Sequence, residues 1–559
     1  MPTTASPNCQ AAILQCRAAK ERRRRNGEGD IGAGSFRSRT TEHETLFTLV
    51  GKIDQQVCRI VWGLSANLPV PVSLGYVIFR LFNAIPPRRS LYPWIDVAYG
   101  SRRYRMPTYR RTFLRQSSLA ASALAFPAVV RGQNLNSRLQ VACVGCNGMG
   151  YSDLKNVGSH AAVKFVGFCD VDTSRFDKAD ADFPGIAHFQ DYREMFSKLG
   201  DGVDAVTVGI PDHMHAPVAV AAMQRKKHVY CQKPLAHTVW EARQMRLWAE
   251  KMGVTTQMGN QIHSAIEYRL GTRLLKEGAI GKIKEVHSWV AVSGNERTRL
   301  LEPAPSGAKP PATLDWNLWI GAAQMRDYAP GYHPFTWRDW QEFGGGALGD
   351  FGCHILDPVF TALGLNAPIK ISARNSGVNH HVWPVNETIE YVFPGNDMIA
   401  GDTLKVTWSD GGLHPDRKIA KMPPELELPK SGSVFIGEKG NLVLAHVAGP
   451  RLYPVENFTG FKYPKEEGKS HWHVWVDACL AGAKTSDGFH YAGPLAETVQ
   501  LGNVITRLAK ATVDPVTGRM DDQGITLDWD TTNLTFPNHP EADKLLTKQY
   551  REGFEVSAA

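Results

Sequence analysis

Residues 139–150 read LQVACVGCNGMG, and this stretch decides the fold of the chain around it. Apolar residues from Leu139 to Val144 predict a buried strand that runs into a glycine-rich turn and the start of a helix. A second apolar run, Val163–Cys169, ends in Asp170, about 20 residues beyond Gly150. A strand, a glycine turn, a helix start and an acid at this spacing predict a dinucleotide-binding site.

Each part of this motif has a physical role. Glycines let the backbone approach a pyrophosphate, and the helix N-terminus offers it free N–H groups and the positive end of the helix dipole. We therefore predict cofactor contacts at Gly145, Asn147, Gly148, Met149 and Gly150. Asn147 stands where a second glycine is usual, and we expect the turn to survive because asparagine tolerates positive φ better than most residues.

The acid after the second apolar run bears on the choice of cofactor. Asp170 would accept hydrogen bonds from the adenosine ribose, and its carboxylate would repel a 2′-phosphate. The sequence therefore favours NAD, while Arg175 nearby leaves NADP open as an alternative.

The positive charge of the chain is concentrated at its N-terminal end. Residues 1–131 contain 20 Lys and Arg against 7 Asp and Glu, whereas the rest of the 559 residues contains 43 against 48. The basic balance belongs to this leader, so the body of the chain shows no general attraction for nucleic acid.

The leader contains a candidate export signal. Arg110-Arg111-Thr112-Phe113-Leu114 precedes a small and apolar run, Leu119 to Val130, that is too short to span a membrane. This pattern predicts a twin-arginine (Tat) signal and linker over residues 106–135, with the Tat export machinery as a partner, a periplasmic destination and no stable membrane insertion. Met106 stands just before the arginine pair, so we interpret residues 1–105 as a spurious or disordered extension.

Six cysteines lie beyond the leader, and none falls in a metal-binding pattern. Cys143 and Cys146 form a CxxC, but the first lies in the predicted strand and the second in the turn, and no second pair stands at zinc-finger spacing. We predict buried free thiols and no metal site.

Residues 136–260 alternate short apolar runs with helical patterns. This alternation predicts a doubly wound parallel sheet, an NAD(P)-binding Rossmann domain of the α/β class. Ligands of such sheets lie at the carboxyl ends of the strands. Beyond the glycine turn and Asp170, residues near the predicted strand ends therefore add cofactor contacts at Pro211, His215, Gln232 and Asn260.

The pattern changes after residue 260. Tyr268 to Glu277 predicts a helix, and alternating runs such as Lys284 to Ser293, Thr388 to Phe393 and Thr403 to Ser409 predict a largely antiparallel sheet. Residues 261–559 are therefore predicted to form a C-terminal α+β domain that binds substrate.

Three residues could carry hydride chemistry. Lys233 ends a strand beside the predicted nicotinamide, and Asp350 and His354 are four residues apart in a predicted helix, so they share a face. Oxidation of a carbinol needs a base for the hydroxyl proton, which suits histidine, and a lysine can stabilise the developing alkoxide. Each residue alone has an ordinary explanation: a solvated lysine, a helix cap or a core histidine. Together beside a dinucleotide fold they predict a catalytic set that also contacts substrate.

The body of the chain, residues 138–555, resembles the glucose–fructose oxidoreductase / inositol dehydrogenase / MocA (Gfo/Idh/MocA) family, particularly its exported members. The family's Glu-Lys-Pro motif is similar to Gln232-Lys233-Pro234, and its Asp-xxx-His motif is similar to Asp350 and His354. The resemblance implies a Rossmann domain, a C-terminal domain whose open-faced sheet often forms homo-oligomers, and catalytic roles for Lys233 and His354. Gln232 replaces the family's glutamate and removes a counter-charge near the lysine.

An aromatic stretch, Tyr332-His333-Pro334-Phe335-Thr336-Trp337-Arg338, also resembles exported relatives. Aromatic rings give sugars an apolar face, so we predict substrate contacts at Tyr332 and His333. A guanidinium can reach a phosphate, so we predict cofactor contacts at Trp337 and Arg338.

The sequence therefore favours an NAD(P)-dependent oxidoreductase that acts on CH–OH groups of a sugar, polyol or glycoside. Export implies a tightly bound cofactor, because free nicotinamide cofactor is expected to be scarce outside the cytoplasm. Two alternatives stay open: an NAD-dependent glycosidase that oxidises, eliminates and re-reduces its sugar, and a non-catalytic sugar-binding relative.

Overall fold

The computed structural model describes residues 138–294, 307–513 and 520–559. The predicted extension over residues 1–105 and the predicted export signal over residues 106–135 lie outside these residues.

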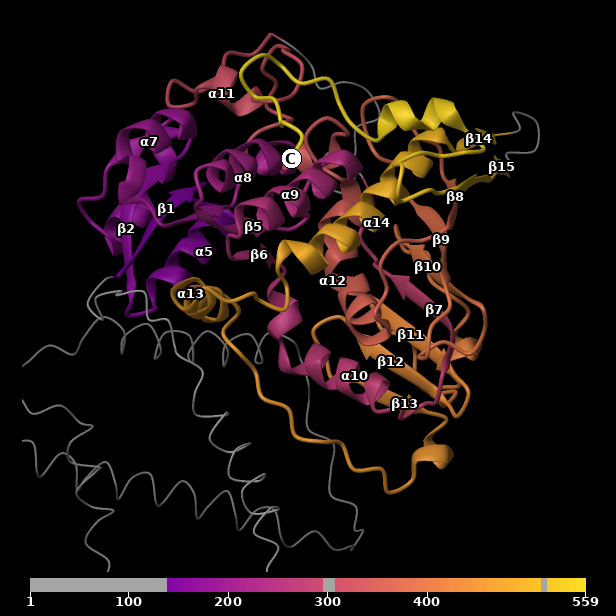
Figure 1. Ribbon diagram of the computed structural model, residues 1–559. Helices are drawn as coiled ribbons and strands as arrows, with labels where there is room; N and C mark the ends of the chain where they lie inside the picture. Colours follow the sequence, from indigo (N-terminus) through magenta and orange to yellow (C-terminus); the bar gives the residue numbers. More distant parts are fainter. Residues whose placement is uncertain (1–137, 295–306, 514–519) are drawn as a thin grey trace, which may run out of the picture. The chain divides into compact units, whose positions relative to one another are not determined.

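The first sheet confirms the predicted parallel architecture (Figure 1). Its six strands are all parallel and lie in the order β3-β2-β1-β4-β5-β6, the order of a Rossmann fold. The strand order reverses between β1 and β4, and ligands of doubly wound sheets bind at that point. The strands are β1 (Leu139–Val144), β2 (Val163–Cys169), β3 (His188–Phe189), β4 (Ala205–Val208), β5 (His228–Gln232) and β6 (Thr256–Gly259).

Crossover helices pack on this sheet. They are α5 (Gly148–Gly158), α6 (Asp177–Asp182), α7 (Tyr192–Leu199), α8 (His215–Gln224) and α9 (Val239–Met252). A helix from the far end of the chain joins them: in α13 (His471–Ala481), Trp475 and Val476 are buried in one cluster with Val141 of β1 and Leu154 of α5. Figure 1 shows α13 beside α5. The core around β1 is therefore completed by residues that lie more than 300 positions later.

The second sheet is mixed and largely antiparallel, as predicted. Its eight strands lie in the order β13-β12-β11-β7-β10-β9-β8-β16, and the only parallel pair among them is β7 with β10. They are β7 (Ile283–Trp289), β8 (Lys370–Asn375), β9 (Glu387–Pro394), β10 (Thr403–Ser409), β11 (Gly432–Gly437), β12 (Asn441–Ala445), β13 (Arg451–Tyr453) and β16 (Ile525–Asp528). A separate hairpin pairs β14 (Lys510–Val513) with β15 (Met520–Gln523).

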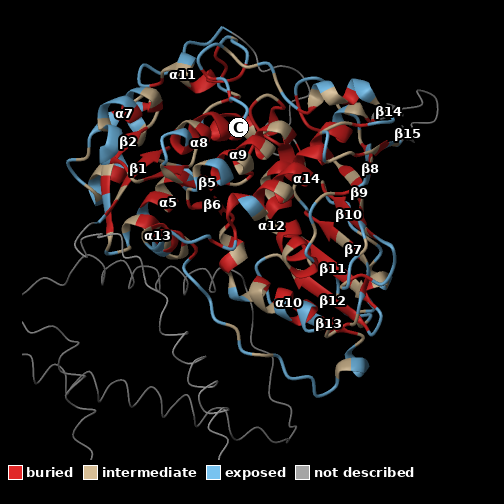
Figure 2. Cartoon of the chain, viewed as in Figure 1, coloured by how far each residue is buried: buried red, intermediate tan, exposed pale blue. Residues whose placement is uncertain are grey.

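Three helices cover one face of the second sheet: α10 (Ile266–Lys276), α12 (Gly346–Leu363) and α14 (Phe489–Leu508). Their apolar sides share a continuous buried core with the strands, which Figure 2 shows between the helices and the sheet. Elsewhere on this sheet, the loop carrying Met422, Leu426 and Leu428 packs against Trp289 and Val434. A short helix, α11 (Trp316–Ile320), belongs to a separate aromatic cluster.

The prediction of buried free thiols is confirmed for the body of the chain. Its six cysteines are free and buried.

None of the helices between residues 138 and 559 that the structure describes is both long and apolar enough to cross a bilayer.

Candidate active site

A crevice of about 520 Å³ lies at the carboxyl ends of the first sheet's strands, where the strand order reverses. Its walls come from the glycine turn after β1, the ends of β2, β4 and β5, the loop before α12 and α12 itself. The predicted site residues that line it are Gly145, Asn147, Gly148, Met149, Asp170, Pro211, Gln232, Lys233, His333, Trp337, Arg338 and Asp350.

Close backbone packing makes two of the glycines necessary. A Cβ on Gly145 would lie 2.2 Å from the carbonyl oxygen of Gly209, and one on Gly150 would lie 2.3 Å from that of Gly145. Gly150 therefore seats α5 against the ends of β1 and β4 and does not itself line the crevice. The first turn of α5 holds no acidic side chain that would repel a phosphate.

The expectation for Asn147 was wrong in its physical basis. Its φ is −135°, an extended conformation, and the positive φ values fall on Gly145 (92°) and Gly148 (57°). The Asn147 side chain instead caps α5 by accepting a hydrogen bond from the Gly148 N–H. Asparagine is favoured here as an N-cap and not for left-handed backbone.

Asp170 lines the crevice at the end of β2, and Asp172 follows it two residues later. Asp170 accepts hydrogen bonds from the backbone N–H groups of Cys146 and Asp172, which hold its carboxylate beside the glycine turn. Arg175 is paired with Asp172 at 3.0 Å. Because the guanidinium is already engaged by a carboxylate, the geometry favours a ribose hydroxyl over a 2′-phosphate, and the residues present fit NAD.

Lys233 and Asp350 meet across the crevice. The Lys233 ammonium donates to both the side-chain Oδ1 and the backbone carbonyl of Asp350, each at 2.6 Å. Arg338 approaches the same carboxylate at 3.7 Å while its guanidinium stacks on Trp337 at 4.2 Å. One carboxylate thus gathers two cations from different segments.

Asn260 fixes the protonation pattern of His354. The Asn260 amide nitrogen donates to the Cys353 carbonyl at 3.0 Å, which turns its oxygen toward His354 Nδ1 at 2.5 Å. Nδ1 must therefore carry the proton, and in the neutral ring Nε2 is the basic nitrogen. Burial first, and then Lys233, lower the His354 pKa well below its usual value, so the ring is neutral near pH 7.

Gln232 is held by a carboxylate that no sequence motif indicates. Its amide nitrogen donates to Oδ2 of Asp153 at 2.7 Å, and Trp472 Nε1 donates to Oδ1 of the same side chain at 2.8 Å. Burial raises the Asp153 pKa to about 7. Asp153 lies on α5 and Trp472 on α13. The hydrogen bond between them therefore exists only once α13 has packed on the first sheet.

Two more functional groups were missed by the sequence analysis. Asp212 lines the crevice beside Pro211, accepts a hydrogen bond from the Gly345 N–H, and has its pKa raised to about 7 by burial. Its position at the end of β4 could have indicated it. His446, after β12, brings a second imidazole within 5.8 Å of the His354 ring centroid, and no local pattern predicts that approach.

Four predicted site residues lie outside the crevice lining besides Gly150. His215 is buried, with its two ring nitrogens 2.7 and 2.8 Å from the carbonyls of Pro234 and Ile210. Tyr332 packs among the rings of Trp316, Trp340 and Phe343. Asn260 and His354 form the pair described above. His215 and Tyr332 thus support the ends of the strands and the loop before α12.

The comparisons with known proteins agree with this geometry. Residues 139–260 match the oxidoreductase family's NAD-binding Rossmann fold, and residues 301–399 match its C-terminal α/β domain. Fold and crevice thus define a two-domain protein whose first domain is an NAD-binding Rossmann fold. These two segments, residues 139–260 and 301–399, are thus those of the Gfo/Idh/MocA oxidoreductase family.

The individual curated relatives share only about a quarter of their residues with this chain over the matched segments. Levoglucosan dehydrogenase of Pseudarthrobacter phenanthrenivorans is 26% identical over 156 residues, which are 28% of this chain and 32% of that protein. A glycosyl hydrolase family 109 protein of Shewanella woodyi is 25% identical over 176 residues, 30% of this chain and 37% of that protein. The chain thus spans about a third of the length of these curated relatives.

Among solved structures, the WlbA dehydrogenase from Bordetella pertussis in complex with NADH and UDP-GlcNAcA is 15% identical. The match covers 64% of this chain and 93% of that one, with a TM-score of 0.45.

Proposed function

We propose that this protein is an NAD-dependent oxidoreductase that removes a hydride from a CH–OH group of a sugar, polyol or glycoside. The observation that carries the proposal is the pairing of Lys233 with Asp350 on the wall of the NAD crevice. His354, a neutral histidine, lies one turn beyond Asp350 on α12. This set supplies a cation for an alkoxide and a base for a proton, the two groups that carbinol oxidation needs.

The residues divide the chemistry between them. NAD, when bound, supplies the hydride acceptor. The Lys233 ammonium, held by Asp350, stabilises negative charge on the substrate oxygen as its proton leaves. His354 is oriented by Asn260 so that Nε2 takes up that proton. The similarity to a levoglucosan dehydrogenase supports hydride transfer from a sugar.

The direct test is spectroscopic. Purified protein is mixed with a panel of sugars, polyols and glycosides, and absorbance at the reduced-nicotinamide band is followed, first with endogenous nucleotide and then with added NAD. We expect reduction with at least one member of the panel. Lack of reduction by any of them, with NAD shown to be bound, would argue against this function.

A second function is favoured by one comparison, the similarity to a glycosyl hydrolase family 109 protein. In that case the cofactor would be oxidised and reduced within one catalytic cycle, and a glycoside would be cleaved without net reduction. Product analysis separates the two: a keto sugar with stoichiometric NADH belongs to the dehydrogenase, and released aglycone with unchanged NAD belongs to the glycosidase.

We further propose that the protein is exported through the Tat machinery to the periplasm with its cofactor already bound. The twin arginines at 110 and 111 and the short apolar run that follows support this. N-terminal sequencing of the native protein and nucleotide analysis after denaturation test it. A mature N-terminus near Met1, or protein free of nucleotide, would contradict it.

Homo-oligomerisation through the second sheet is also a proposal. Glu285, Glu390 and Lys405 form ion pairs on the face of β7, β9 and β10 that points away from the helices, and all three side chains are partly exposed. Sedimentation velocity at several protein concentrations tests the assembly, and the mass of a monomer at all of them would contradict it.

A further inference from the structure

We propose that His263, Asp357 and Asp487 form a binding site for a first-row divalent cation, with Zn²⁺ as the best fit. The site lies outside the NAD crevice lining and is independent of the proposed reaction. One ligand atom from each residue lies within 4.8 Å of the other two. Tetrahedral ligands at about 2.1 Å from one ion lie about 3.4 Å apart, so the three side chains would move together by roughly 1 Å on binding.

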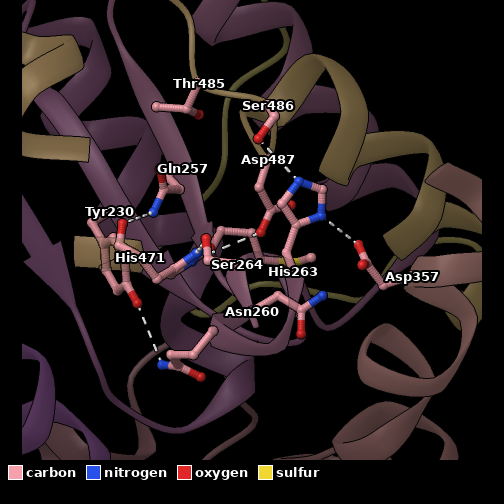
Figure 3. Close-up of polar contacts among 12 residues, drawn as sticks. Tyr230, Gln257, Asn260, His263, Ser264, Asp357, His471, Thr485, Ser486 and Asp487 are labelled. Carbon is pink, nitrogen blue, oxygen red and sulfur yellow. Dashed lines mark hydrogen bonds and ion pairs between the residues drawn. The ribbon is translucent and has the colours of Figure 1, made fainter. Parts of the chain in front are cut away.

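The three residues come from segments far apart in sequence. His263 follows β6, Asp357 lies on α12, and Asp487 directly precedes α14. Figure 3 shows the His263 ring lying between the two carboxylates, with Ser486 above it. His263 Nδ1 is 2.8 Å from Asp357 Oδ1, and Nε2 is 3.0 Å from the Ser486 hydroxyl.

Asp487 is the observation that points to a missing ligand. Its side chain is 1% exposed, yet neither carboxylate oxygen has a hydrogen-bond partner among the described residues. Oδ2 of Asp487 lies 3.9 Å from Nε2 of His471, which is beyond hydrogen-bond distance. That nitrogen is instead hydrogen-bonded to the Met258 carbonyl. Because buried carboxylates are normally paired or bound to a metal, this one lacks a partner that its environment requires.

The neighbouring histidines do not satisfy Asp487 by hydrogen bonding. His471 Nε2 bonds to the Met258 carbonyl, and the two ring nitrogens of His263 bond to Asp357 and Ser486. Asp357 already accepts from both His263 and the Tyr491 hydroxyl. A dication would compensate two carboxylates and use the open lone pairs of Asp487.

The donor set and the surroundings select the kind of cation. One imidazole nitrogen with two carboxylate oxygens suits zinc, and the Ser486 hydroxyl or a water could supply a fourth ligand. Calcium and magnesium favour shells made of oxygen alone. Ser486 is exposed while Asp487 beside it is buried, which gives an ion a short route from solvent to the site.

Metal content and cobalt spectroscopy test the site. Full-length protein without a histidine tag is treated with a chelator, loaded with ZnSO₄ or CoCl₂, and desalted. We expect about one zinc per chain by elemental analysis. We also expect visible cobalt bands typical of a low-coordinate site, and a rise in the melting temperature of about 3–5 °C at saturating zinc.

Asp487→Asn keeps the shape of the side chain and removes its charge, and it should weaken zinc binding at least 100-fold. Asp477→Asn is the matched control, because Asp477 also pairs with a histidine, His160, but is exposed. Wild-type protein that binds no zinc or cobalt and shows no thermal shift would overturn the proposal and leave a buried ion triad. The wild-type measurement does not depend on whether a variant folds. Equal zinc binding by wild type and Asp487→Asn would also overturn the proposal.

Discussion

The amide oxygen of Asn260 lies 2.5 Å from Nδ1 of His354, and the amide nitrogen is tied to the carbonyl of the residue just before that histidine. A side chain at the end of the first sheet therefore sets which nitrogen of a histidine on α12 is basic. Changes at Asn260 should act on the pH dependence of the reaction without removing the base itself.

Asn260→Asp should shift the pH profile. The His354 pKa is held well below its usual value, so wild-type activity should be constant across neutral pH and fall only in acid. A carboxylate at 260 would stabilise the imidazolium and raise this pKa, so the acid limb should move to higher pH. Asn441→Asp is the control, because Asn441 on β12 is equally buried. This variant should lower stability and leave the acid limb of the pH profile unchanged. The measurement is kcat against pH, and an unmoved limb in Asn260→Asp would show that Asn260 does not set the histidine.

Removal of the base or the cation should abolish turnover and spare cofactor binding. His354→Ala should lower kcat by about 100- to 10,000-fold, the usual worth of a general base. Lys233→Met should have an effect of similar size, because the alkoxide loses its cation. Lys548→Met is the control, since Lys548 is a similarly buried lysine paired with Glu241 at 2.8 Å outside the crevice lining. NADH fluorescence titration checks that the nucleotide still binds, and unchanged kcat in both His354→Ala and Lys233→Met would refute the catalytic assignment.

Two alanine substitutions in the glycine turn should differ sharply. Gly145→Ala would place a Cβ 2.2 Å from the Gly209 carbonyl oxygen, so β1, α5 and β4 would have to separate, and NAD binding should be lost. Gly148→Ala meets no atom within 4 Å and costs only the strain of a positive φ, about 1–2 kcal/mol. Isothermal titration with NAD compares them, and equal affinities would show that the close packing at Gly145 is not needed.

Restoring the family's glutamate should destabilise this protein in a pH-dependent way. Gln232→Glu would put a second carboxylate beside Asp153, whose pKa burial already raises to about 7. At pH 5 the pair can share a proton, but near pH 8 both groups would be charged in a buried site, so stability should fall as pH rises. Gln244→Glu, at a buried glutamine that accepts from a backbone N–H, is the control. Melting temperatures at pH 5 and 8 decide the matter, and a loss that did not grow with pH would contradict the pairing.

The fold could be predicted where local pattern and tertiary role agree. Val163–Cys169 and Thr403–Ser409 have the same bounds in the sequence analysis and in the structure, because buried strands in these sheets are nearly continuous apolar runs or clear alternations. Lys233 and Pro211, which were selected because ligands gather at strand ends, both line one crevice.

What could not be predicted depends on contacts between distant segments. Asp153 looks like an ordinary helix residue until Gln232 and Trp472 are brought to it. Asn260 was expected to touch the cofactor, whereas its amide is committed to α12. Tyr332 was expected to meet substrate, but aromatic residues at the same spacing serve equally well to fill a core. No periodicity distinguishes these outcomes, because they are decided by which partner the fold supplies.

The position of α13 has a consequence for how the protein is made. The glycine turn leaves the ribosome early, yet Trp475 and Val476, which cover the β1 side of its sheet, are translated near the end. Until then Val141 and Leu154 would face water or a chaperone. A nascent chain halted before residue 470 should therefore be unable to bind nucleotide. Cofactor would then bind only after synthesis of the chain is nearly complete.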